Sequence, residues 1–198
     1  SCKVLKTRLM KEYGKRFEFD IEDNSNLKKK LMKYFTSYNL TKVKDENSTI
    51  ILEKKWSLLD GWKLNILNWE TKIGINLDEN NKVKINHKVI TNGFGYITPI
   101  AFSSLFEKYL INLEKFINQN ESFERKNNEL IKLGKVKMLK YIGILIVGIL
   151  IGFYFGYILE NLTEIKLFRY VGIIIGALVS EKILNNYLIK NNTLQQHI

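Results

Sequence analysis

The sequence has few of the residues that form covalent cross-links, bind metals or transfer protons. Its 198 residues include one cysteine, one proline and two histidines. The single cysteine, Cys2, excludes an intramolecular disulfide bond and a metal cluster held by several thiolates. Of the histidines, His197 has no expected catalytic partner. His87 occupies an apolar position of an expected strand, so we predict that it packs against a sheet and is not a general base.

The motifs that mark common enzyme classes are also absent. The sequence contains no GxxxxGK[ST] phosphate-binding loop, no GxGxxG after a strand, no GxSxG and no HExxH. Adjacent acidic pairs at 22–23 and 45–46 fall in expected loops, where solvation accounts for them. We therefore predict a protein that is not an enzyme, with no catalytic residues, no metal site and no cofactor.

Positive charge, in contrast, is abundant and unevenly placed. Lysine and arginine total 31 against 20 acidic residues, a net charge of +11. Between positions 125 and 140 one acid faces six basic residues: Arg125, Lys126, Lys132, Lys135, Lys137 and Lys140. No proline- or serine-rich linker interrupts this region, so we predict a basic helical stalk over 121–139 that contacts anionic lipid headgroups. Nucleic acid is a disfavoured partner, because net charge alone supports it.

A long apolar run follows this basic segment. Tyr141–Leu159 has no charged residue over 19 positions, which is about 28 Å of helix against about 30 Å for the hydrocarbon core of a bilayer. A second run, Leu167–Leu188, is long enough only if its charged residues are tolerated. We predict a C-terminal hairpin of two transmembrane helices within residues 140–190, joined by a polar turn.

The charged residues of the second run leave its depth open. Arg169 is near enough to one end to extend toward a membrane surface. Glu181 and Lys182 stand about two thirds of the way along, where an ionisable side chain costs at least ~2.5 kcal/mol on insertion scales. They either form a proton, ion or partner-contact site, or lie in the headgroup layer, which is the interpretation we favour.

Both apolar runs carry small residues at every fourth position. The two rows are Gly148, Gly152 and Gly156, and Gly172, Gly176 and Ser180. On a helix such a row exposes backbone along one face, so another helix can approach closely. The rows can face one another across a turn centred on Glu164, or face a second copy or another subunit. They resemble the glycine-zipper hairpins of several unrelated membrane proteins, which implies helix packing through these residues.

The basic stalk also predicts an orientation. Short segments rich in lysine and arginine stay in the cytoplasm, and the turn between the apolar runs has only Lys166 and Arg169. We predict a location in the cell membrane or an organelle membrane, with both termini in the cytoplasm and a polar tail over 191–198.

Residues 1–120 have the pattern of a small cytoplasmic α+β domain. Alternation of apolar and polar residues predicts strands at 17–21, 41–44, 49–54, 62–67, 69–77 and 83–89. Amphipathic helices are expected after Ser25 and after Thr98 and Pro99. We predict a two-layer domain of about six antiparallel strands and two helices, an order that resembles helix-grip folds.

Three tryptophans within 14 residues give this domain a second interpretation. Trp56, Trp62 and Trp69 either belong to the core or line a candidate groove for a lipid or another hydrophobic ligand. Our leading hypothesis is a non-catalytic membrane-anchored module, an accessory subunit or scaffold that assembles through glycine-rich transmembrane helices. It would act as a homo-oligomer or as a subunit of a membrane complex. The alternative is lipid or hydrophobic-ligand binding by the cytoplasmic domain at the membrane surface.

Overall fold

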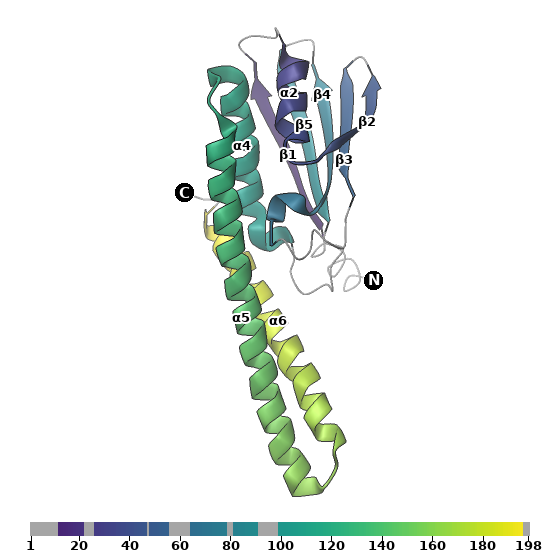
Figure 1. Cartoon of the computed structure of the whole chain (residues 1–198), viewed down its shortest axis with the longest axis vertical. Helices are drawn as coiled ribbons and strands as arrows, with labels where there is room; N and C mark the ends of the chain where they lie inside the picture. Colours follow the sequence, from purple (N-terminus) through teal and green to yellow (C-terminus); the bar gives the residue numbers. More distant parts are fainter. Residues whose placement is uncertain are drawn as a thin grey trace. The chain divides into compact units, whose positions relative to one another are not determined.

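The structure, a computed structural model, describes residues 12–21, 26–46, 48–55, 64–78, 81–90 and 99–195. The chain divides into two compact units, Ser1–Lys135 and Val136–Ile198. The first unit contains a sheet and the helices packed on it, and the described part of the second is helical (Figure 1).

The first unit is built on a five-stranded antiparallel sheet. Its strands are β1 (Glu12–Asp20), β2 (Thr41–Glu46), β3 (Thr49–Lys54), β4 (Glu70–Leu77) and β5 (Lys82–Ile90). They are arranged in the order β1-β5-β4-β3-β2, so β1 and β2 are the two edges. Every pairing is antiparallel. The antiparallel sheet predicted from the alternating residues is therefore confirmed.

The sheet has one apolar face and one charged face. Four alternate residues of β5 are buried: Val83, Ile85, His87 and Val89. Lys88, between two of them, lies on the other face and forms a 2.8 Å ion pair with Glu12 of β1. This period of two follows from the geometry of a strand, in which successive side chains point to opposite faces.

Two amphipathic helices cover the apolar face of the sheet (Figure 1). Helix α2 (Leu27–Thr36) connects the two edge strands, and α4 (Ser103–Gln119) follows β5 after the 3₁₀ turn η2 (Pro99–Phe102). Tyr34 of α2 and Tyr109 of α4 are buried, with ring centroids 5.0 Å apart. The two helices predicted from their apolar stripes are present, while Ser25 and Thr98 lie outside the described residues.

One predicted strand is wrong in its described part. We expected a strand over 62–67, but Ile66–Asn68 forms the 3₁₀ turn η1. The side chain of Asn65 accepts a hydrogen bond from the backbone N–H of Leu67 at 3.0 Å. This local bond favours a helical turn over an extended strand, because short amide side chains compete for backbone donors.

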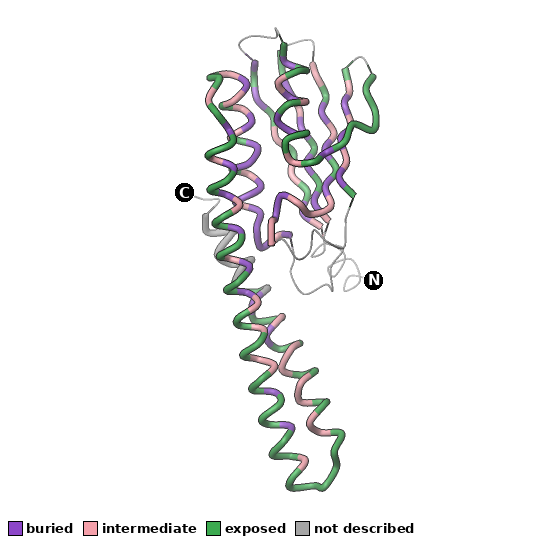
Figure 2. Tube along the Cα trace, in the orientation of Figure 1, coloured by how far each residue is buried: buried purple, intermediate pink, exposed green. Residues whose placement is uncertain are grey.

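The last two helices are α5 (Phe123–Thr163) and α6 (Leu167–Gln195). Among the described helices, α5 is the one long and apolar enough to cross a membrane, by length and composition. The second half of α5 is largely exposed (Figure 2). Among its large apolar residues, Leu150 and Tyr154 are 60% and 62% accessible. The first apolar helix predicted from the sequence is therefore present.

Candidate functional site

The first turns of α5 are packed into the core of the first unit. The Phe123 ring lies 4.7 Å from Tyr34 and 4.8 Å from Phe116, between centroids. Asn127, one turn later, has no exposed surface, and Leu130 is also buried. The first half of the predicted stalk thus contributes Phe123, Asn127 and Leu130 to the core of the domain. Arg125, Asn128 and Glu129 in the same half are exposed.

A buried hydrogen-bond network fixes Asn127 in place. Its amide nitrogen Nδ2 donates to the Tyr34 hydroxyl at 2.9 Å, and its oxygen Oδ1 accepts from Asn112 Nδ2 at 2.8 Å. The Tyr34 hydroxyl donates to the Tyr109 carbonyl oxygen at 2.5 Å. Burial raises the pKa of Tyr34 well above its ordinary value, so the phenol stays neutral. The network ties α5 to α2 and α4.

Replacing Asn127 with alanine is expected to destabilise the first unit by about 2–3 kcal/mol, because Tyr34 and Asn112 lose a partner and a cavity forms. Urea denaturation followed by tryptophan fluorescence measures this loss. Asn128, the next residue of the same helix, is exposed, so Asn128→Ala should change stability by less than about 0.5 kcal/mol. Equal stability of the two variants would show that the network is not needed.

The six basic residues predicted to contact a membrane surface differ in their surroundings. Arg125, Lys132, Lys135 and Lys140 are exposed, and Lys126 and Lys137 are half-buried. Two of them are already paired within α5 and its leading turn: Arg125 Nε with Glu129 at 3.5 Å, and Lys126 with Glu121.

The six small residues of the two rows lie against one another in the second unit. A side-chain carbon at Gly148 would meet Ser180, and one at Gly152 would lie 2.9 Å from the Cα atom of Gly176. A carbon at Gly172 would lie 3.0 Å from the Cα atom of Gly156. Helices α5 and α6 therefore make backbone-to-backbone contact along these rows, and the contact is within a single chain.

An ion pair joins the two helices next to their connecting turn. Arg169 donates from Nε and Nη2 to the two carboxylate oxygens of Glu160, at 2.8 and 3.0 Å. The guanidinium also lies 5.3 Å from the ring centroid of Tyr157 and 5.7 Å from that of Phe153. Sequence reasoning placed Arg169 at a membrane surface but did not pair it with Glu160, which is nine residues away and on the other helix.

Two of the three tryptophans of the candidate ligand groove lie outside the described residues. These are Trp56 and Trp62. The third, Trp69, packs on core rings, with its centroid 5.1 Å from Phe102 and 6.2 Å from Phe106. His87 is 3% exposed and packs among aromatic rings. Burial lowers the pKa of His87 to about 3, so its imidazole is neutral near pH 7.

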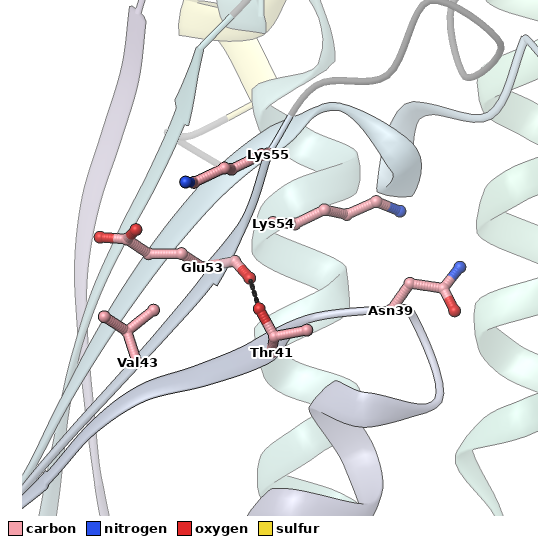
Figure 3. A pocket seen from close by; sticks show the side chains of 6 residues that line it. All are labelled: Asn39, Thr41, Val43, Glu53, Lys54 and Lys55. Carbon is pink, nitrogen blue, oxygen red and sulfur yellow. Dashed lines mark hydrogen bonds between the residues drawn. The ribbon is translucent and has the colours of Figure 1, made fainter.

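A pocket with a volume of about 340 Å³ opens beside the edge strand β2 (Figure 3). Its lining residues are Asn39, Thr41, Val43, Glu53, Lys54 and Lys55. The ammonium of Lys54 donates to the Tyr38 carbonyl oxygen at 3.2 Å and to Asn68 Oδ1 at 2.6 Å, and Glu53 pairs with Lys72 at 2.6 Å. These charged groups are therefore engaged in holding the fold.

Within the described ranges, no group of three or more histidine, cysteine, aspartate or glutamate side chains could hold a metal ion. Comparison of the chain with protein family models, with curated proteins and with solved structures gives no match.

Proposed function

We propose that this protein is a non-catalytic membrane-anchored module that serves as an accessory subunit or scaffold. The observation that carries the proposal is α5, which begins in the core of the first unit and continues as an apolar helix with exposed side chains. At about 1.5 Å per residue, the 41 residues of α5 are long enough both to pack in the first unit and to cross a bilayer. Lipid is the solvent that such exposed apolar side chains require.

We further propose that α6 returns through the same bilayer, so that α5 and α6 form a transmembrane hairpin. Contact through the glycine rows supports this, because small residues let membrane helices pack closely. The Arg169–Glu160 pair supports it as well, since a neutralised guanidinium costs less to place near lipid than an unpaired one. With the rows used inside one chain, assembly with a second copy or another subunit would use the outer faces of the pair.

Cysteine accessibility in intact cells tests this topology, because the chain has a single cysteine to remove. In a Cys2→Ser background, Glu164→Cys marks the turn between α5 and α6, and Thr193→Cys marks the end of α6. Two crossings predict that a membrane-impermeant maleimide labels position 164 from outside and position 193 only after lysis. Labelling of position 193 from outside would mean a single crossing. Extraction of the full chain by alkaline carbonate would remove the membrane proposal altogether.

The basic segment is expected to select anionic lipid, but only through its last residues. A headgroup layer is about 5–7 Å deep on each side of the hydrocarbon core. At about 1.5 Å per residue, Lys137 and Lys140 fall within this depth of Tyr141 if α5 enters along the bilayer normal, whereas Arg125 is about 24 Å away. That is more than twice the Debye length of about 8–10 Å. Lys137 and Lys140 are thus the basic residues of the segment that lie nearest the anionic headgroups.

Replacing Lys137 and Lys140 with glutamine is expected to lower selectivity for phosphatidylserine over phosphatidylcholine by roughly fivefold per residue, at about 1 kcal/mol each. Spin-labelled lipids in reconstituted vesicles report this ratio. The matched control replaces Arg125 and Lys126 with glutamine and should leave selectivity unchanged. Equal effects of the two double variants would contradict a contact confined to the end of the segment.

A further inference from the structure

The outer edge of strand β1 is long and regular, unlike that of β2. All nine residues of β1 pair with β5 in one unbroken register. Strand β2 has six residues, and its pairing with β3 shifts register between Lys42 and Lys44. An irregularity of this kind protects an edge from pairing with another chain. Of the two edges of the sheet, β1 is therefore the one that can accept a further strand.

The hydrogen bond at the end of β1 shows which backbone groups face outward. The N–H of Ile21 donates to the Asn81 carbonyl oxygen at 2.9 Å, and these two residues continue the register of β1 with β5. Hydrogen-bonded pairs alternate along an antiparallel ladder. Phe17 therefore also directs its N–H and C=O groups to β5, whereas Arg16 and Glu18 direct theirs to the open edge.

Helix α4 runs beside this edge in step with β1. Glu107 of α4 pairs with Lys15 at 2.6 Å. Asn118, further along α4, donates to the carbonyl oxygen of Asp20 at 2.9 Å, as expected for a backbone group that points away from β5. The two contacts are about 16 Å apart along both elements, at about 1.5 Å per helical residue and about 3.3 Å per strand residue.

The centre of the edge is apolar. By the same spacing, Ile111 of α4 is level with Phe17 of β1. Ile111 is 39% exposed and Phe17 is half-buried. Ile111 also shares one helical face with Glu107 and Asn118, the two residues of α4 that contact β1. An apolar patch in two layers therefore borders the open edge.

The geometry points to a dimer in which β1 pairs antiparallel with β1 of a second copy, about a two-fold axis at Phe17. The two five-stranded sheets then form one continuous sheet. Phe17 lies opposite Phe17 of the second copy, and the outward backbone groups of Arg16 bond those of Glu18 across the axis. A two-fold contact uses the same patch on both copies. All of its residues belong to the first unit, so the dimer is independent of the membrane anchor proposed above.

Charge selects this register over its neighbours. It places the exposed Arg16 of each copy directly opposite the exposed Glu18 of the other. Opposite charges in such cross-strand positions stabilise a sheet, and like charges destabilise it. Moving the axis by one residue in either direction would set Arg16 against Arg16 or Glu18 against Glu18. The axis at Phe17 avoids both conflicts.

Helix α4 is self-complementary about the same axis. An antiparallel second α4, centred on Ile111, brings Glu107 level with Lys115 of the other copy and Lys108 level with Glu114. Lys108 and Lys115 are exposed, and Glu107 and Glu114 are half-buried. Opposite charges thus meet in the helical layer as well as in the sheet. A second copy of this chain is therefore the partner that the edge fits.

Disulfide formation measures the contact. In a Cys2→Ser background, Phe17→Cys places two thiols across the axis, where a Cα–Cα distance of about 4.5 Å suits a disulfide bond. Oxidation of the full chain in detergent micelles should convert most of it to a dimer on a non-reducing gel. Val43→Cys is the matched control on the other edge strand, 60% exposed, and should stay monomeric. Equal linking at the two positions, or none at position 17, would overturn the proposal.

Exchange of the two charges tests the register without changing the core. Arg16→Glu and Glu18→Arg each set like charges opposite one another, so each should raise the Kd of the dimer about tenfold. The double variant restores opposite pairs and should return the Kd close to that of the parent chain. Sedimentation equilibrium in density-matched detergent measures these constants. A double variant as weak as the single ones would refute the register. A parent chain that is monomeric but resists alkaline carbonate extraction would refute the dimer and leave the membrane proposal standing.

Discussion

An isoleucine in place of Gly152 is expected to force α5 and α6 apart, and an isoleucine in place of Gly143 is expected to leave them together. A Cβ atom at position 152 would lie 2.9 Å from the Cα atom of Gly176 and 3.0 Å from the carbonyl carbon of Gly172. The carbonyl oxygen of Gly172 would be closer still. These are backbone atoms that cannot rotate away, so the helices must separate. At Gly143, no atom lies within 4 Å of an added Cβ apart from the adjacent residues and nearby backbone of its own helix.

The separation can be measured as a distance. Ile146 on α5 and Leu178 on α6 are about half exposed, so each can carry a spin label in a Cys2→Ser background. Electron–electron double resonance in nanodiscs should give one narrow distance for the parent chain and for Gly143→Ile. The Gly152→Ile variant should give a longer and broader distribution. Overpacking of this kind costs on the order of 1–3 kcal/mol per site, and adding Gly176→Ile should increase the effect.

An unchanged distance in Gly152→Ile would show that α5 and α6 do not depend on close contact in lipid. The same result would remove the support that the glycine rows give to the transmembrane hairpin. Gly143→Ile is the control for the effect of isoleucine on the helix itself, because isoleucine has a lower helix propensity than alanine or leucine at any position. A loss seen in both variants would report on the helix itself and not on the contact.

The parts of the fold that the sequence predicts are those set by local periodicity. Alternation along 83–89 predicts β5 because a half-buried strand needs that pattern. The turn η1 was missed because it depends on the Asn65 side chain, whose bond to the Leu67 amide competes with the strand pattern. The core role of Phe123 and Asn127 was also missed. Their spacing is helical, but the surrounding charges in 121–139 favour an exposed helix, and only contact with α2 and α4 reveals the buried stripe.

The candidate sites also divide into those set by local spacing, which the sequence predicts, and those set by contacts between distant residues, which it does not. Spacing of four residues identifies the glycine rows, because a regular helix brings such positions to one face. Which surface they meet depends on the turn between α5 and α6, which periodicity does not describe. The pairing of Arg169 with Glu160 and the cluster around His87 depend on residues far apart in the chain. For His87, the one available signal was its apolar position on a strand, and that signal indicates burial without indicating that Nδ1 has no partner.

Protonation of His87 in the unfolded state is expected to destabilise the first unit at mildly acidic pH, where carboxylates are still ionised. Burial lowers the pKa of His87 to about 3 in the folded state, against about 6.5 in an unfolded chain. Between these values the unfolded state binds a proton that the folded state does not. Stability is therefore complete above about pH 6.5 and falls as the pH drops below it. The loss is about 1.4 kcal/mol per pH unit, or about 2 kcal/mol at pH 5.

Urea denaturation at pH 7.5 and pH 5, followed by tryptophan fluorescence in nanodiscs, measures this loss. His87→Phe keeps a ring against Phe106 and removes the titrating group, so its stability should be the same at both pH values. His197→Phe is the matched control and should keep the pH dependence of the parent chain. Carboxylates such as Asp45, whose pKa is lowered by bonds to Lys28 and Lys42, act in the same direction but lose their contribution only below about pH 4. A parent chain equally stable at pH 7.5 and pH 5 would contradict this prediction. It would mean that protonated His87 reaches water without unfolding, against the packing of Tyr13, Phe106 and Tyr109 around its ring.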